Sequence, residues 1–203
     1  MPLIVIEGID GCGGETHSNF LRDWLTKKGL KNIRIESPNN STPVGQTYDK
    51  YLHEKFNMES DAIFLLCACD VIMNKSLIEN ARKEGVFVIA DRYITSTIAY
   101  QGANGFSFDK ALKLVDLMEF PKADAILYIG ISPDTSMKRK QKEKGSLDKH
   151  EKNEQFLAKV REFYKKEIEK SVLGEWFVID GEKSIEKIQE DITRLLSEKF
   201  GIK

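Results

Sequence analysis

The chain has 203 residues, of which 41% are hydrophobic and 31% are charged, with 31 basic and 32 acidic side chains. This composition can bury one sizeable core, so we expect a single domain over residues 1–203 in a soluble, cytoplasmic protein. The balanced charge and the lack of a long apolar run argue against recruitment of nucleic acid, attraction to a membrane surface, and a membrane span.

The first predicted element is a strand over Leu3–Ile6, which runs into a glycine-rich loop and then into a helix over Thr16–Lys27. This order is that of a phosphate-binding loop, whose backbone amides and helix N-terminus attract anions. The register of such a loop places its lysine and its hydroxyl on Gly14 and Glu15, so both charge-handling side chains are missing. The residues expected to contact nucleotide phosphates are Gly8, Asp10, Gly11, Cys12, Gly13, Gly14, Glu15 and Thr16.

Two residues of this loop leave alternatives open. Glu15 lies in the first helical turn, where its carboxylate either caps the helix or holds Mg²⁺ as a hard oxygen ligand. Cys12 is either a small loop residue or a catalytic thiol. The three cysteines lack the C-x-x-C spacing, which argues against a zinc site and a disulfide framework.

Four further apolar runs alternate with helical or charged segments that are long enough for crossover connections. This repetition predicts an α/β fold with a parallel sheet, and near-continuous apolar runs are typical of strands buried on both faces. The predicted strands are Ile33–Ile35, Val86–Ala90, Ala125–Ile131 and Trp176–Ile179.

Two intervening segments carry further expectations. Ser60–Lys83 predicts one long helix whose broad apolar side can cover the core and also a partner subunit. Residues 133–154 are dense in lysine and glutamate, which is typical of a solvated helix face or of a lid that carries cations over a bound polyphosphate.

Asp91 and Arg92 directly follow the predicted strand Val86–Ala90. Ligands of open parallel sheets bind at the carboxyl ends of strands, so this pair predicts a site in which Asp91 holds Mg²⁺ and Arg92 binds a phosphate. A simple surface ion pair between the two side chains is the structural alternative.

Several motifs recur along the chain in a characteristic order and spacing. The motifs are Gly8-Ile9-Asp10-Gly11, Pro38 with Ser41-Thr42-Pro43-Val44-Gly45, Leu65-Leu66-Cys67-Ala68-Cys69-Asp70, Asp91-Arg92-Tyr93 with Ser96, Ala99-Tyr100-Gln101-Gly102, and Val178-Ile179-Asp180 with Ser184-Ile185-Glu186. No single motif is decisive, but together they make the chain resemble the thymidylate kinase family over nearly its whole length.

The resemblance implies a three-layer P-loop NTPase fold with a five-stranded parallel sheet flanked by helices, and a lid at about residues 133–154. It implies a nucleoside monophosphate kinase that transfers the γ-phosphate of ATP to dTMP or a related nucleoside monophosphate, with Mg²⁺. It also implies a homodimer that packs through the segment corresponding to Ser60–Lys83.

Matching positions assign roles to individual side chains. The resemblance places Asp91 near the metal and Arg92 on the acceptor phosphate, while Glu15 stays a second candidate metal ligand on its chemistry alone. It offers Arg139 as a catalytic lid cation and places Gly181 near adenine. The residues expected to contact the acceptor are Asp10, Pro38, Asn40, Phe64, Cys67, Val71, Arg92, Tyr100 and Gln101.

The departures from the family are equally informative. Asn40 stands where the family commonly has an arginine, which weakens the grip on the acceptor phosphate. Cys67 and Val71 replace a phenylalanine that would stack on thymine, worth roughly 1–3 kcal/mol, and an arginine that would bond the base. Phe64, one helical turn earlier, can partly substitute for the missing ring. The lid cations that can compensate at the donor site are Lys138, Arg139, Lys140, Lys142 and Lys144.

Three functions therefore stay open at the level of the sequence. The first is a nucleoside monophosphate kinase of the thymidylate kinase type, with weakened or altered activity. The second is a catalytically impaired homologue that binds nucleotide or serves as a dimeric interaction protein. The third is a kinase whose acceptor is a different pyrimidine or purine monophosphate.

Overall fold

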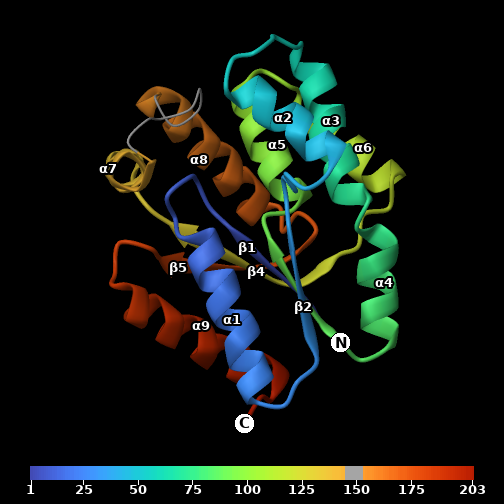
Figure 1. Ribbon diagram of the computed structural model, residues 1–203, viewed down its shortest axis with the longest axis vertical. Helices are drawn as coiled ribbons and strands as arrows, with labels where there is room; N and C mark the ends of the chain where they lie inside the picture. Colours follow the sequence, from blue (N-terminus) through green and yellow to red (C-terminus); the bar gives the residue numbers. More distant parts are fainter. Residues whose placement is uncertain (145–152) are drawn as a thin grey trace.

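The computed structural model describes residues 1–144 and 153–203, and it is built around a sheet of five parallel strands (Figure 1). The spatial order is β2-β3-β1-β4-β5. The strands are β1 (Leu3–Glu7), β2 (Asn32–Glu36), β3 (Phe87–Asp91), β4 (Ala123–Gly130) and β5 (Gly174–Asp180). The predicted α/β fold and its parallel sheet are confirmed, with strand ends displaced by one or two residues.

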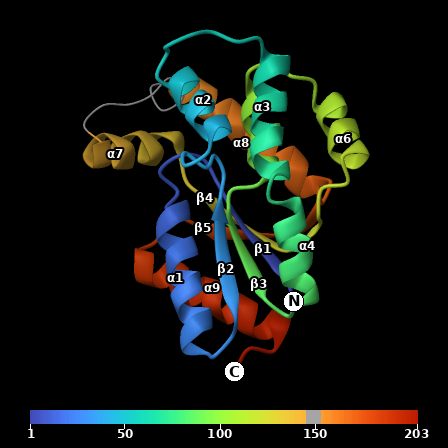
Figure 2. The same ribbon diagram turned by 45° about the vertical axis from the view of Figure 1, so that its right-hand side comes forward.

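Helices cover both faces of the sheet, which gives the predicted three layers. In β1, Ile4 and Ile6 join one buried cluster, whereas Leu3 and Val5 join the other, so this strand is apolar throughout because both of its faces are covered. The first cluster lies under α1 (Gly14–Lys27), α8 (Glu154–Glu169) and α9 (Ile185–Phe200), and the second under α3 (Ser60–Ile72), α4 (Lys75–Lys83) and α6 (Phe108–Leu117). Figure 2 shows α1 and α4 on opposite sides of the strands.

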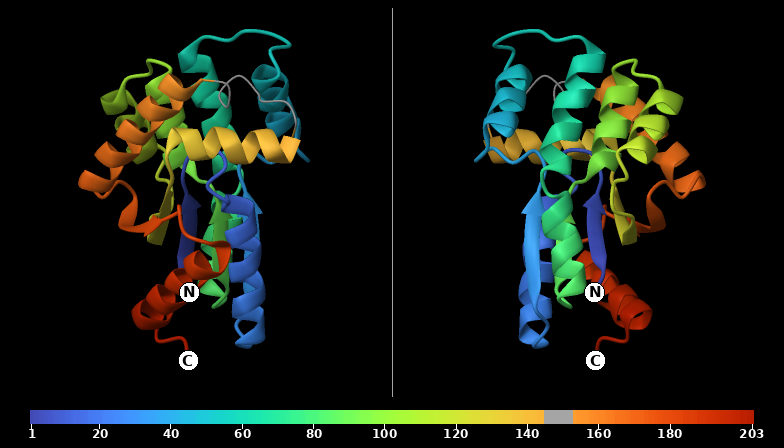
Figure 3. Two further views of the ribbon diagram at one scale, coloured as in Figure 1. Left: turned by 90° about the vertical axis from the view of Figure 1, so that its left-hand side faces the viewer. Right: turned by 90° about the vertical axis from the view of Figure 1, so that its right-hand side faces the viewer.

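The remaining helices gather beyond the carboxyl ends of the strands. Figure 3 shows α2 (Pro43–Leu52) and α7 (Pro133–Lys144) on this side, above the tips of the arrows. The buried helix α5 (Ile94–Ala103) begins just after β3 and contacts α3, α6 and α8. This end of the sheet is where parallel α/β proteins bind their ligands.

The prediction of one long helix over 60–83 is wrong, because the segment forms α3 and α4 with a break at Met73–Asn74. The side chain of Asn74 donates to the carbonyl of Asp70 (3.4 Å), and its backbone N–H bonds to the carbonyl of Val71 (3.1 Å). Asparagine competes in this way with regular helical hydrogen bonds.

Residues 133–144 of the predicted lid form α7, whereas its last two residues, Asn153 and Glu154, cap and begin α8. Residues 145–152 and the side chain of Lys144 lie outside the described part of the chain. Within the described ranges, no helix is both long enough and apolar enough to cross a membrane.

A buried carboxylate joins the end of β1 to the start of α5. Glu7 is fully buried, and its Oε1 accepts hydrogen bonds from the backbone N–H groups of Tyr93 (3.0 Å) and Ser96 (3.2 Å) and from the hydroxyl of Thr95 (2.5 Å). Its Oε2 accepts from the hydroxyls of Ser96 (2.5 Å) and Tyr164 (2.7 Å). Burial raises the pKa of Glu7, and these donors offset part of the cost of burying it.

We expect Tyr164→Phe to lower the free energy of unfolding by about 2 kcal/mol, because a buried carboxylate loses a donor while the ring is kept. The matched control is Tyr93→Phe, which removes a single bond from the Tyr93 hydroxyl to the carbonyl of Pro121 (3.1 Å) and should cost about 1 kcal/mol. Urea titrations followed by circular dichroism measure both losses. Equal losses in the free energy of unfolding would show that the hydrogen bond to Glu7 stabilises the fold no more than the bond to Pro121 does.

Candidate active site

Two cavities lie at the carboxyl ends of the strands, and they share two side chains. We call them the loop cavity, between the glycine loop, α7 and the start of α9, and the helical cavity, between α2, α3 and α5. Asp10 and Arg92 line both of them. The walls of the loop cavity include Asp10, Gly11, Cys12, Gly13, Gly14, Glu15, Thr16, Asp91, Arg92 and Arg139.

The loop after β1 depends on glycine at particular positions. Gly11 and Gly13 have φ angles of 77° and 91°, in the left-handed region that favours glycine, and Gly13 forms the N-cap of α1. A Cβ on Gly8 would lie 2.7 Å from the carbonyl oxygen of Ile129, so β4 presses directly on the start of the loop. The loop amides and the start of α1 therefore keep the geometry of an anion site.

Cys12 fits the interpretation as a small loop residue. Its side chain is buried, and burial raises the pKa of the thiol to about 11. The thiol is therefore protonated at neutral pH, whereas a nucleophilic cysteine needs a lowered pKa.

Glu15 is exposed at the second position of α1, and the helix start has no side-chain cap. Its carboxylate thus acts on the helix only through its charge. A few residues along, His17 is buried beneath Gly13, with its ring 3.1 Å from where a Cβ of Gly13 would lie. Burial and the nearby Arg139 lower the pKa of His17 to about 4, so this ring is neutral at pH 7.

Asp91 ends β3, and its partner is Arg34 of β2 rather than Arg92. Its Oδ2 lies 2.7 Å from a terminal nitrogen of Arg34 and 3.3 Å from the hydroxyl of Ser18. Its Oδ1 faces the backbone of Gly14, where a Cβ would lie only 2.6 Å away. Any side chain at position 14 would therefore displace this carboxylate. The surface ion pair considered for Asp91 and Arg92 does not form.

Arg34 was not identified from the sequence, although a charged residue inside an apolar strand could have drawn attention to it. Its guanidinium also contacts Glu36 (2.7 Å) and the hydroxyl of Ser18 (2.8 Å), so it is held between β2, β3 and α1. Arg34 thus supplies a positive charge beside Asp91, next to a glycine loop that has no lysine of its own.

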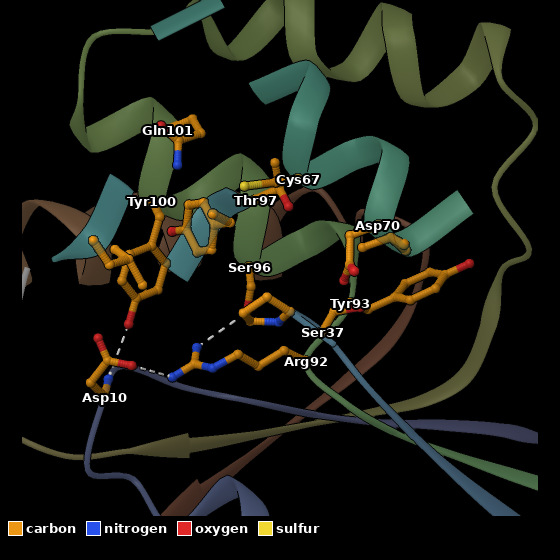
Figure 4. Close-up of a pocket in the computed structure, with 14 residues that line it drawn as sticks. Asp10, Ser37, Cys67, Asp70, Arg92, Tyr93, Ser96, Thr97, Tyr100 and Gln101 are labelled. Carbon is orange, nitrogen blue, oxygen red and sulfur yellow. Dashed lines mark hydrogen bonds and ion pairs between the residues drawn. The ribbon is translucent and has the colours of Figure 1, made fainter. Parts of the chain in front are cut away.

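Arg92 lies between the two cavities and is held from several sides (Figure 4). Its guanidinium donates to the carbonyl of Gly8 (2.8 Å), the hydroxyl of Ser96 (3.2 Å) and the carboxylate of Asp10 (2.7 Å), and it lies over the ring of Tyr100. The backbone N–H of Asp10 donates to the hydroxyl of Tyr100 (3.0 Å). These contacts fix the orientation of Arg92, which lines both cavities directly after the end of β3.

Arg139 extends from α7 to the glycine loop and lines the loop cavity. It donates to the carbonyls of Gly11 (3.2 Å) and Gly181 (2.9 Å), and so links the loop to the turn after β5. Gly181 is held through its carbonyl, while Lys183 and Ser184 line the loop cavity beside it.

The helical cavity brings together most of the residues predicted for the acceptor. Pro38, Cys67, Val71, Tyr100 and Gln101 line it together with Asp10 and Arg92. The Nε2 of Gln101 is buried without a hydrogen-bond partner in the described part of the chain, and Figure 4 shows it pointing into the cavity. The residues of this wall that were not predicted as acceptor contacts are Ser37, Tyr48, Leu52, Asp70, Tyr93, Ser96 and Thr97.

Two predicted acceptor residues lie elsewhere. Phe64 is buried with only 1% exposure and stacks on Phe106, with ring centroids 4.2 Å apart, so it does not replace the missing ring. Asn40 is exposed on the loop after β2 and is not part of the described cavity wall. The prediction of a substituting Phe64 is therefore wrong, because the apolar core on the other side of α3 holds this ring.

Asp70 fixes the loop that carries Pro38. Its carboxylate accepts from the backbone N–H of Asn39 (3.2 and 3.3 Å), and burial raises its pKa. Since α3 contributes Asp70, the same helix that forms one wall of the helical cavity also sets the position of the opposite loop.

The residues around Asp91 fit a magnesium ion. Its Oδ1 and the carboxylate of Glu15 are hard oxygen donors on the wall of the loop cavity. The described residues contain no cluster of three potential metal ligands. Mg²⁺ in kinases is typically held by one or two carboxylates together with substrate phosphates, so such a cluster is not required.

Comparisons with known proteins agree on one family. A family model described as thymidylate kinase matches residues 6–192. Thymidylate kinases of Fervidobacterium nodosum and Francisella tularensis are 29% and 31% identical, over 96% and 97% of this chain and 98% and 96% of their own lengths. A solved thymidylate kinase structure from Candida albicans shares the fold, with a TM-score of 0.80 and 23% identity, over 100% of this chain and 93% of that one.

The close approach of Asp91 to Gly14 predicts that a methyl group added at position 14 destabilises the fold. We expect Gly14→Ala to lower the free energy of unfolding by about 1–3 kcal/mol through overpacking, although alanine is normally the better helix residue. In an Asp91→Ala background the same change should cost nothing, because the carboxylate is gone. Urea unfolding of the four variants in this double-mutant cycle measures the coupling. An equal cost in both backgrounds would refute the contact as its cause.

Proposed function

The chain belongs to the thymidylate kinase family, and we propose that it transfers the γ-phosphate of ATP to the phosphate of dTMP or a related nucleoside monophosphate. Membership of this family makes the protein a nucleoside monophosphate kinase. The observation that carries the proposal is the position of Asp10 and Arg92, which line both cavities. A donor phosphate in one cavity and an acceptor phosphate in the other would meet at these side chains.

In this proposal the loop cavity binds ATP and the helical cavity binds the acceptor. The amides of the glycine loop and the N-terminus of α1 hold the donor phosphates, while Arg139 adds a positive charge from α7. Arg92 neutralises phosphate oxygens at the junction, and its bond to Asp10 (2.7 Å) fixes its orientation. Positioning and charge stabilisation of this kind supply most of the catalysis of phosphoryl transfer.

Asp91 and Glu15 are the residues that would hold Mg²⁺. When bound, this ion neutralises charge on the phosphate oxygens. Arg34 competes for Asp91 through its ion pair at 2.7 Å, so the affinity for the metal depends on how readily Oδ1 alone serves as a ligand.

In the helical cavity, Gln101 and Tyr100 contact the acceptor nucleoside. The unpartnered Nε2 of Gln101 is a buried donor, and a carbonyl oxygen of the base would satisfy it. Since the bases of dTMP and several other nucleoside monophosphates carry carbonyl groups, this contact alone leaves the choice of base open.

Two other candidate functions each have an observation in their favour. A homologue that binds nucleotide without catalysis is favoured by Gly14 and its contact with Asp91, because no lysine reaches the donor phosphates from this position. A kinase with a different acceptor is favoured by Cys67 and Val71, which line the helical cavity in place of the ring and the cation of the family.

We expect Arg139→Met to lower kcat/KM for ATP by about 10²–10³-fold, since it removes a preorganised positive charge. Lys138→Met is the matched control on the same helix, because Lys138 is exposed and pairs with Asp134 (2.6 Å), and it should leave kcat/KM within about twofold. A coupled assay of ADP release with Mg²⁺ and a panel of nucleoside monophosphates measures both variants.

Two results of this assay would contradict the proposal. Equal activity of the Arg139 variant and the wild type would reject the catalytic role of this arginine. No turnover of any acceptor by the wild type would reject the kinase and favour the nucleotide-binding homologue, which calorimetry with ATP then tests.

We propose that the protein works as a homodimer in the cytoplasm. Its support is a set of exposed side chains at four-residue intervals, which we call the stripe: Leu65 and Cys69 on α3, Met73 at the break after α3, and Leu77 on α4. Leu65 and Met73 are 57% and 55% exposed, and clustered exposed apolar side chains are typical of an interaction surface. Free cysteines suit a reducing compartment.

We expect sedimentation to show a dimer of the 23.2 kDa chain and a shift to monomer when Leu65 and Met73 are both replaced by glutamate. The matched control is Leu117→Glu on α6, a side chain that is 75% exposed away from the stripe. A wild-type monomer, or a control that dissociates equally, would refute the proposed interface.

A further inference from the structure

The helical cavity has an aromatic side chain where the family pattern does not supply one. Cys67 lines this cavity in place of the expected phenylalanine, and Phe64 is held in the core. Tyr48 of α2 lines the same cavity, where its side chain is a neighbour of Cys67. The ring that is missing from α3 thus has a counterpart on α2.

The position of Tyr48 is fixed by the way α2 begins. The hydroxyl of Thr42 accepts from the backbone N–H of Gly45 (3.1 Å), which caps the helix. A Cβ on Gly45 would lie only 2.0 Å from the carbonyl oxygen of Asn39, so this turn is packed directly on the loop before it. Since Asp70 holds Asn39, the ring of Tyr48, about one turn further on, is attached to a rigid support.

Tyr48 and Cys67 also complement each other in size. The thiol is small, and the Tyr48 side chain is its neighbour in the cavity wall. A phenylalanine at position 67 would extend toward Tyr48 and compete with it for the same space. The cavity can therefore hold a ring on α2 or a ring on α3, and in this chain it holds the one on α2.

We propose that Tyr48 is the aromatic platform on which the base of the acceptor nucleoside monophosphate stacks. This inference rests on the function proposed above and adds to it a specificity-determining residue. Stacking tolerates any base because every base has a π-face, so the platform contributes affinity for nucleobases. Val71, which also lines the cavity, presents an apolar surface where a cation would otherwise select a carbonyl. The site is therefore expected to bind a nucleobase but to discriminate less between bases at the edge that faces Val71.

The test is direct binding of dTMP, dCMP and dGMP by calorimetry, which does not require catalysis. Tyr48→Leu should weaken binding about 5- to 150-fold, the range for one lost stacking contact. Tyr48→Phe keeps the ring and should stay within about threefold. The matched control is Lys50→Leu, an exposed position on the same helix, which should bind as the wild type does.

A swap of the ring between the two helices makes the test sharper. Cys67→Phe alone should weaken binding, because two rings then compete for one space. The double variant with Tyr48→Leu and Cys67→Phe should recover most of the affinity lost in Tyr48→Leu. Circular dichroism checks that each variant is folded, and binding of ATP, measured separately, reports on the loop cavity.

The possible results separate this inference from the proposed function. Unchanged binding in Tyr48→Leu, or no recovery in the folded double variant, would overturn the platform and leave the kinase standing. A wild type that binds none of the three monophosphates would overturn both.

Discussion

The buried carboxylate of Glu7 is the constraint on which the geometry of the site depends. It is taken out of water at the end of β1, and this is tolerable because the start of α5 and the hydroxyl of Tyr164 on α8 present donors to it. The next turn of the chain is the glycine loop, and Arg92 leaves β3 beside it. Glu7 therefore sets the relative position of the glycine loop, Arg92 and α5, and α5 carries Tyr100 and Gln101.

Position 14 of the loop is a glycine instead of a lysine, and the neighbouring side chains occupy the space beside it. With glycine at position 14, the carboxylate of Asp91 comes within 2.6 Å of where a Cβ would be, and Arg34 supplies the positive charge that balances it. This arrangement protects the fold from an unpaired, largely buried carboxylate. It also means that a lysine cannot simply be added back at position 14, because Asp91 and Arg34 would have to move together.

The sequence predicts the architecture well because apolar strands and glycine loops have strong local signals. Motifs shared with a family also single out Arg92, Tyr100, Gln101 and Arg139, and all four line the cavities at the carboxyl ends of the strands. It fails where a role depends on the direction of a side chain. Phe64 and Cys67 lie one turn apart, yet one enters the core and the other the cavity, and the broad apolar surface of α3 gave no hint of which.

Arg34 and Tyr48 were not predicted from the sequence for a related reason. Each lies in space near a residue that departs from the family pattern but is distant from it along the chain. Both come from the segment that runs from β2 through the loop at 37–42 into α2. Arg34 pairs with Asp91, whose carboxylate lies beside Gly14, and Tyr48 lines the helical cavity with Cys67. Asp70 ties the loop between them to α3, so a shift of that one segment would alter both cavities. Neighbours of both departures from the family pattern therefore lie on one segment, and we expect a change in this segment to affect the donor and acceptor sides of the site together.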